Sequence, residues 1–131
     1  MNVENLVILI VEDHSVRESL EQLVERRPNV DVISADNFFS AAIWINAVPR
    51  IDLLLCDFLL PGQMTGVDVA DVAVLSHPAI AVVIISSDAR SEIAGMRDTY
   101  AFIRKPFVGQ QLSAHIDKAF LKLHPLTKPI L

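Results

Sequence analysis

The chain has 131 residues, a net charge of −5, 52% hydrophobic residues and a single cysteine, Cys56, and this length is enough for one hydrophobic core. No apolar run reaches the roughly 18 residues that a membrane helix needs, and the start of the chain lacks the pattern of a signal peptide, so we expect a cytoplasmic protein without a membrane contact. The lone cysteine excludes an internal disulfide, and the acidic charge without a basic stripe argues against nucleic-acid binding.

The apolar pattern predicts strands that alternate with helices. In chain order, the predicted elements are a strand at residues 6–11, a helix at 15–27, a strand at 30–34, a helix at 38–48, a strand at 51–56, a helix at 67–76, strands at 80–85 and 100–104, and a helix at 108–123. Continuous runs of Val, Ile and Leu are typical of parallel strands buried on both faces. The pattern therefore predicts a doubly wound α/β sandwich, formed by a single domain over residues 1–131 with a short tail at 124–131.

The helix ends give more local predictions. Ser15 and Glu18 have the spacing of a capping box, and Asp36 is expected to cap the second helix. Residues 88–98 are only weakly periodic, so we expect no more than a turn or two of helix there. Three aromatic residues of the second helix are expected in the core or in a groove: Phe38, Phe39 and Trp44.

Acidic and hydroxyl residues directly follow three of the apolar runs. Glu12 and Asp13 follow the first, Asp57 follows the second, and Ser86 follows the third. Ligands bind at the carboxyl ends of the strands in such sheets, so these side chains should converge on one edge. Clustered carboxylates are unfavourable unless a cation neutralises them. The sequence therefore predicts a hard, oxygen-binding metal ion at this edge, most simply Mg²⁺.

These residues, taken together, resemble a known family. An acidic pair after strand one, an Asp after strand three, a Ser or Thr after strand four and Lys-Pro after strand five mark response-regulator receiver domains. Here they are Glu12–Asp13, Asp57, Ser86 and Lys105–Pro106. The resemblance covers about residues 5–123. It implies the flavodoxin-like receiver sandwich, with a five-stranded parallel sheet in the order 2-1-3-4-5, in which strands one and three are neighbours.

The resemblance also implies a role for each residue of the site. Asp57 would accept the phosphoryl group, and Lys105 and Ser86 would contact its oxygens. The expected ligands of Mg²⁺ are Asp13, Asp57 and the backbone carbonyl of Leu59, with Glu12 in the outer shell. On phosphorylation Ser86 would move toward the phosphoryl group and Phe102 would swing inward, which repacks a surface that partners bind. The peptide bond between Lys105 and Pro106 would be cis.

Such a domain would act as a phosphoacceptor in a two-component or phosphorelay system. It would not be an enzyme, beyond assisting its own phosphotransfer and dephosphorylation. The expected partners are a histidine kinase or a histidine phosphotransfer protein, which supplies the phosphoryl group from a phosphohistidine, and a downstream protein target. We expect a monomer or a weak dimer.

Two segments depart from the commonest family pattern. The loop at residues 61–66 is one residue longer and resembles the loop of receivers in hybrid histidine kinases and in some stand-alone receivers. Residues 86–105 are a few residues short, which predicts a truncated fourth helix. A truncated helix there argues against the family's common dimer, which is built on helix four, strand five and helix five.

Several alternatives stay open. Asp13 alone is also compatible with a helix cap, Ser87 is a rival for Ser86, and Tyr100 is a rival for Phe102. The main alternative function is a pseudo-receiver that binds partners without phosphorylation, although an acidic edge is unfavourable in a pure scaffold. A phosphatase with an aspartate nucleophile would need a second Asp where the chain has Leu59, and the P-loop motif of nucleotidases is absent from the sequence.

Overall fold

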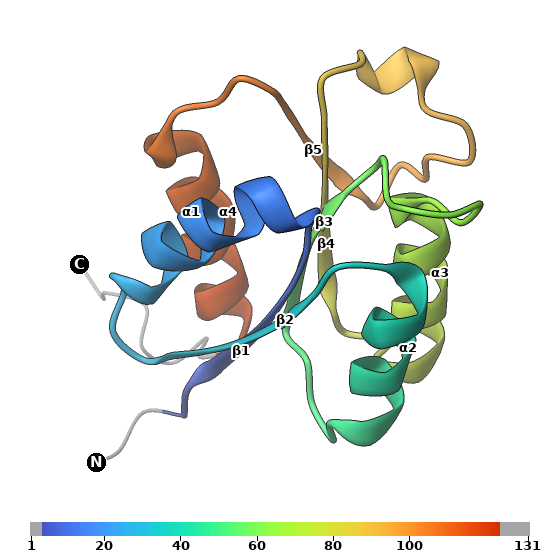
Figure 1. The fold of residues 1–131 in the computed structure, drawn as a ribbon. Coiled ribbons are helices and arrows are strands. Elements are labelled where there is room, and N and C mark those ends of the chain that lie inside the picture. The colour runs from blue at the N-terminus through green and yellow to red at the C-terminus, as the bar shows by residue number, and fades with distance from the viewer. Residues whose placement is uncertain (1–3, 124–131) are drawn as a thin grey trace.

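The computed structural model describes residues 4–123, apart from the side chains of residues 14–17. Within this range five parallel strands form one sheet in the order β2-β1-β3-β4-β5 (Figure 1). The strands are β1 (Leu6–Val11), β2 (Val30–Ala35), β3 (Leu53–Asp57), β4 (Ala81–Ser86) and β5 (Ala101–Arg104). The helices are α1 (His14–Glu25), α2 (Phe38–Ala47), α3 (Gly66–Ser76) and α4 (Gly109–Leu123), with a single 3₁₀ turn, η1, at Arg90–Glu92. The predicted fold class and strand order are confirmed.

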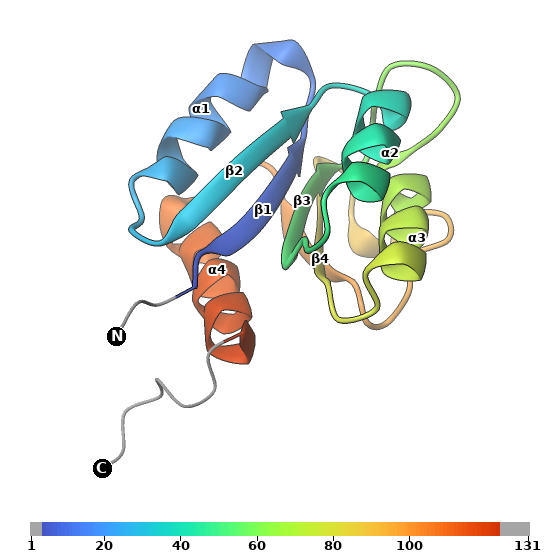
Figure 2. The same ribbon diagram turned by 90° about the horizontal axis from the view of Figure 1, so that it is seen from below.

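The helices cover the sheet on both faces. Helices α1 and α4 lie on one face, and α2 and α3 lie on the other (Figures 1 and 2). Alternate residues of β1 serve the two layers: Ile8 and Ile10 pack in the core beneath α1 and α4, and Leu9 and Val11 pack in the core beneath α2 and α3. Because both faces are covered, β1 is apolar throughout, and β3 and β4 are apolar up to their last residues, Asp57 and Ser86.

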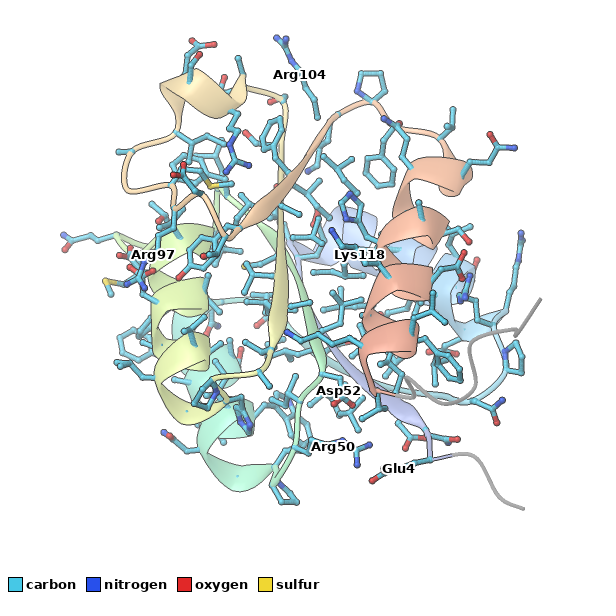
Figure 3. All side chains as sticks on the ribbon, turned by 180° about the vertical axis from the view of Figure 1, so that it is seen from behind. Glu4, Arg50, Asp52, Arg97, Arg104 and Lys118 are labelled. Carbon is cyan, nitrogen blue, oxygen red and sulfur yellow. The ribbon has the colours of Figure 1, made fainter. Side chains whose placement is uncertain are left out.

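One charged residue interrupts the apolar run before β3. The Asp52 carboxylate accepts the backbone N–H of Val7 at 2.8 Å and pairs with Arg50 Nε at 3.0 Å. Arg50 also pairs with Glu4. Figure 3 shows Glu4, Arg50 and Asp52 together near the starts of β1 and β3. The acid therefore fastens the start of β3 to the start of β1, since it supplies an acceptor to a backbone donor that would otherwise lack one.

Two of the capping predictions are wrong. Helix α1 begins at His14, so Ser15 lies inside the helix. Helix α2 is capped by Asn37, whose side-chain oxygen accepts the N–H of Ser40 at 2.8 Å. Asp36 instead accepts a hydrogen bond from the Asn37 side chain, because it lies one residue too early to reach the first helical turn.

Residues 87–100 contain only the η1 turn, so the prediction of a truncated helix is confirmed. The segment is nevertheless anchored to the rest of the protein. Ile93 is buried, and Arg90 donates to the backbone carbonyls of Tyr100 at 2.7 Å and Arg97 at 2.9 Å. The Tyr100 hydroxyl donates to Asp71 of α3 at 2.5 Å. An arginine side chain thus replaces part of the backbone bonding that a helix would supply.

The expected burial of the aromatic residues of α2 is only partly correct. Phe38 is half-buried against the core, whereas Phe39 and Trp44 are exposed. No helix within residues 4–123 is long and apolar enough to cross a membrane.

Candidate functional site

The candidate site lies at the carboxyl edge of the sheet, where four strands end side by side. Glu12 follows β1, Asp57 ends β3, Ser86 ends β4, and Lys105 follows β5. The backbone keeps these positions in line with the sheet beyond the last strand residues. The N–H of Glu12 donates to the carbonyl of Ala35 at 3.1 Å, and the N–H of Lys105 donates to the carbonyl of Ser86 at 2.8 Å. Residues separated by up to 93 positions in the sequence are therefore brought to one place.

One ammonium group joins the two buried carboxylates of the site. Lys105 Nζ lies 3.0 Å from Asp57 Oδ1 and 3.3 Å from Glu12 Oε1. Glu12 is only 1% exposed and Asp57 only 7%. Two carboxylates and one ammonium carry a net charge of −1 when all three are ionised, so Lys105 alone does not neutralise the pair.

The burial of this negative charge raises the pKa of both acids. Burial and the neighbouring Asp57 raise the pKa of Glu12 to about 7, against the opposing effect of Lys105. Burial also raises the pKa of Asp57, which the hydrogen bond and charge of Lys105 partly offset. The charge of Asp13 adds to the rise at both residues. For Lys105, burial lowers the pKa, but the hydrogen bond to Asp57 and the charge of Glu12 outweigh burial, so the pKa is raised.

The residues at this edge fit a bound cation. Among the side chains that the structure describes, none is a hydrogen-bond partner of the buried Glu12 Oε2, which is unfavourable for a carboxylate oxygen. A hard divalent cation with its water ligands would supply the missing positive charge and donors. In the part of the chain that the structure describes, no group of three or more His, Cys, Asp or Glu side chains is arranged as a complete metal site. Mg²⁺ does not require one, because it usually keeps several waters and takes only one or two protein carboxylates.

The remaining predicted residues lie around this centre. Asp13 is exposed and directly follows Glu12 after β1. Ser86 is buried and its hydroxyl accepts the backbone N–H of Asp88 at 3.0 Å, whereas its rival Ser87 is exposed. Leu59 is two residues past Asp57, in the loop after β3, with its side chain exposed.

The two aromatic candidates lie at β5, which ends next to the predicted Lys-Pro pair: Phe102 is on the strand, and Tyr100 directly precedes it. Phe102 is half-buried and packs against the core beneath α2 and α3. Tyr100 is fully buried, and its hydroxyl is bound by Asp71. Of the two, Phe102 therefore has the freer side chain. The peptide bond between Lys105 and Pro106 is cis, the isomer that the resemblance implied.

Gly66 is part of the site, although the sequence pattern did not predict it. Its N–H donates to the carbonyl of Phe58 at 2.8 Å, which closes the loop after β3. A Cβ atom on Gly66 would lie 2.2 Å from the backbone oxygen of Asp57. Only glycine lets α3 begin this close to the end of β3. The sequence signal was weak, because glycine also occurs near helix starts that approach no other backbone.

The comparisons with known proteins agree with this geometry. The family model described as response regulator receiver domain matches residues 8–117. The chain belongs to this family. Receiver domains are phosphoacceptor modules of two-component signalling, generally not enzymes, and they generally bind Mg²⁺ at their acidic pocket. They interact with histidine kinases or phosphotransfer proteins and with downstream effectors.

Solved receiver structures have the same fold. A receiver protein from Sinorhizobium medicae is 23% identical with a TM-score of 0.80, and the match covers 93% of this chain and 99% of that one. The receiver domain of the hybrid histidine kinase CckA is 26% identical with a TM-score of 0.71, covering 87% and 98%. A response regulator from Chloroflexus aurantiacus is 27% identical with a TM-score of 0.73, covering 89% and 98%. The comparison with curated proteins found no match.

We predict that Gly66→Ala disturbs the site as well as the fold. The added methyl group meets the backbone of Asp57, so the strand end or the helix must shift. Overpacking of this kind lowers the free energy of unfolding by about 1–3 kcal/mol, which urea denaturation would measure. Gly109→Ala is the matched control, because its Cβ would meet Leu23 at an ordinary 3.5 Å. Equal stability of the two variants would contradict the packing argument.

Proposed function

We propose that Asp57 accepts a phosphoryl group from a phosphohistidine of a kinase or phosphotransfer protein, with Mg²⁺ as cofactor. The supporting observation is the pairing of buried Asp57 and Glu12 with the single ammonium of Lys105, at 3.0 and 3.3 Å. In this proposal residues 5–123 form the core of one receiver domain. The domain assists its own phosphotransfer and dephosphorylation but transforms no other substrate.

The chemistry at Asp57 is a nucleophilic displacement at phosphorus. A carboxylate oxygen of Asp57 forms the new bond to phosphorus while the bond from phosphorus to the donor's imidazole nitrogen breaks. The bonding electrons return to the imidazole, and the product is an acyl phosphate on Asp57. Because the transition state is loose, the protein contributes mainly positioning and neutralisation of the charge on the equatorial oxygens.

Lys105 and Ser86 supply that neutralisation in the proposal. The ammonium group of Lys105 already lies 3.0 Å from Asp57 Oδ1, so it is positioned before the phosphoryl group arrives. Such preorganised charge needs little rearrangement during the reaction. The Ser86 hydroxyl lies at the end of the neighbouring strand and is a second donor for a phosphoryl oxygen once it turns from Asp88.

Mg²⁺ would be held by Asp13, Asp57 and the backbone carbonyl of Leu59, with Glu12 binding a metal-bound water. When bound, the ion would neutralise negative charge shared by the carboxylates and the phosphoryl oxygens. The assignment of Glu12 is supported by its buried Oε2, which has no hydrogen-bond partner within the described part of the chain.

The switch would act through β5 and the segment of residues 87–100. Ser86 is held by the N–H of Asp88, so its movement toward a phosphoryl group releases the start of this segment. Phe102 is half-buried against the core beneath α2 and α3, and in the proposal it turns inward. The bonds of Arg90 and Asp71 to residues near β5 would then rearrange, which changes the surface offered to a downstream protein.

We predict that Asp57 is the only phosphorylation site. Incubation with acetyl phosphate and Mg²⁺ should add one acid-stable, base-labile phosphoryl group, detected by mass spectrometry of the intact protein. Asp57→Asn should abolish the modification, because an amide is not a nucleophile here. Asp31→Asn, an exposed acid on β2, is the control and should be modified normally. Modification of Asp57→Asn to the wild-type extent would refute the assignment, and no modification of the wild-type chain would favour the pseudo-receiver.

We predict that Asp13 contributes to the affinity for Mg²⁺ in the absence of any phosphoryl donor. Asp13→Ala removes one of the two protein carboxylates proposed as ligands, so the affinity for Mg²⁺ should fall by roughly tenfold or more. Isothermal titration of the unphosphorylated protein with Mg²⁺ measures this directly. Asp88→Ala, an exposed acid beyond β4, serves as the control. Equal Mg²⁺ affinity in wild type and Asp13→Ala would show that Asp13 is not a ligand.

We predict that phosphorylation loosens residues 87–100 before any other segment. The reason is that Ser86 holds Asp88, and few backbone hydrogen bonds hold the rest of the segment. Amide hydrogen exchange should become faster in residues 87–100 when Mg²⁺ and beryllofluoride, a phosphoryl mimic, are added. The central strands should change less. Asp57→Asn under the same conditions should show no change. If the exchange protection of residues 87–100 in the wild-type protein does not change, the proposed switch is wrong.

A further inference from the structure

A cavity of about 420 Å³ opens at the edge of the sheet that β5 forms, between α3 and α4. It lies at the starts of β4 and β5, whereas Asp57 and Ser86 lie at the carboxyl ends of their strands. Figure 3 shows α3 and α4 on either side of this edge. The proposed phosphoacceptor role does not use the cavity. Its volume is within the range of cavities that bind small molecules, about 300–1,000 Å³.

The cavity is open because β4 begins before β5 along the edge of the sheet. The first residue of β5, Ala101, lies opposite the third residue of β4. The first two residues of β4, Ala81 and Val82, therefore have no strand partner on that side within the described part of the chain. Only the last two residues of the segment 87–100 reach the cavity. This segment, with its single 3₁₀ turn, thus leaves the start of β4 uncovered.

The inner wall of the cavity is apolar. Side chains from β3, α3, β4, β5 and the residue before β4 form it: Leu53, Val74, Ile80, Val82, Val83 and Ala101. Most of these side chains also belong to the buried core, so packing fixes the shape of the wall before anything binds. A preformed apolar wall favours a ligand with an apolar body, because binding removes apolar surface from water without rearranging the protein.

The outer rim of the cavity is basic. His115, Lys118 and Lys122 line it from α4, and no Asp or Glu side chain lines it. Figure 3 shows Lys118 on the side of α4 that faces β4. Among the described residues, no carboxylate forms an ion pair with either lysine. Asp117 precedes Lys118 in the sequence but pairs with Arg27 instead. The rim therefore has positive charge that is available to a ligand.

The two lysines lie close to each other on the helix. Lys118 and Lys122 are four residues apart, and like charges at this spacing destabilise a helix. Lys122 Nζ donates to the carbonyl of Ala79 at 3.0 Å, which holds this ammonium group beside the residues that precede β4. Burial and the charge of Lys118 lower the pKa of His115, so its ring is neutral at pH 7. An anionic group between the two lysines would offset their repulsion.

We propose that this cavity binds a small organic anion, with its apolar body against the wall and its carboxylate between Lys118 and Lys122. The wall selects the apolar body and the lysines select the charge. The preference for an anion is particular to this place, because the chain as a whole carries a net charge of −5 and repels anions. The cavity lies at the opposite ends of the strands from Asp57, so binding should need neither Mg²⁺ nor phosphorylation.

Octanoate is a suitable probe, because it combines a carboxylate with an apolar chain. In ¹H–¹⁵N correlation spectra of the whole chain, octanoate should shift the amide signals of Ala81, Val82 and Lys118. The dissociation constant should be on the order of 0.1–1 mM for a ligand of this size. Acetate lacks the apolar chain, and octylammonium has the opposite charge. Both should bind roughly tenfold more weakly or worse.

The role of the basic rim is tested by reversing one charge. Lys118→Glu should weaken octanoate binding by roughly tenfold or more, because it places a carboxylate beside the bound anion. Lys118→Arg keeps the charge and should bind octanoate like wild type. Arg26→Glu reverses an exposed charge directly after α1 and is the matched control, so it should also bind like wild type. Circular dichroism checks that the variants are folded.

Four outcomes overturn the proposal. They are no shift at the cavity with octanoate up to about 10 mM, binding of octylammonium as tight as that of octanoate, unchanged binding by Lys118→Glu, and equal shifts at the exposed Phe39 and Ile43 of α2. The last result would mean adsorption to any apolar surface. Asp57→Asn should bind octanoate like wild type, so failure of this proposal is distinguishable from failure of the proposed phosphoacceptor function.

Discussion

The contact between Lys105 and the buried acids is the interaction on which the site depends. Lys105 Nζ lies 3.0 Å from Asp57 and 3.3 Å from Glu12, both almost fully buried. A buried carboxylate is tolerated only with a partner, and one ammonium shared by two carboxylates leaves a residual negative charge. Burial, together with the charge of Asp57, raises the pKa of Glu12 to about 7. The site thus lacks positive charge. This deficit favours the binding of a divalent cation and, together with that cation, of a phosphoryl group.

The fold creates this contact by chain topology. Parallel strands all end at the same edge, so residues after β1, β3 and β5 meet without any local sequence relation. Two features hold the edge in register. Backbone bonds extend the sheet past the strands at Glu12 and Lys105, and Gly66 brings the start of α3 against the backbone of Asp57. At the opposite end Asp52 satisfies Val7, which fixes how far β1 and β3 advance toward the site.

The sequence predicted the strands, the fold class and the identity of the residues at the edge, since a doubly covered sheet leaves a strong apolar signal and polar residues end each run. It did not predict Asn37 as the cap of α2, because Asp36 is an equally good capping residue. Which of the two neighbours caps the helix depends on how the chain leaves β2. It missed Gly66 because close backbone approach leaves no periodic pattern. It placed Phe39 and Trp44 in the core or in a groove, because an apolar residue in an uncharged helix is normally buried. Only the packed structure shows that Ala41 and Ile45 already fill that layer.

The replacement of a helix by residues 87–100 has a consequence for how the chain meets partners. A helix would present a regular face beside β5, but here Arg90 binds the carbonyls of Tyr100 and Arg97 while Asp71 binds the Tyr100 hydroxyl. These bonds link the segment to α3 and to the start of β5, so a change at Ser86 reaches both elements through side chains. Burial and the bond to Asp71 raise the pKa of Tyr100 to about 12, so its hydroxyl stays a donor at physiological pH. The face next to β5 is therefore a polar loop held by side-chain bonds, and the exposed apolar side chains of α2 lie at the other edge of the sheet, beside β2.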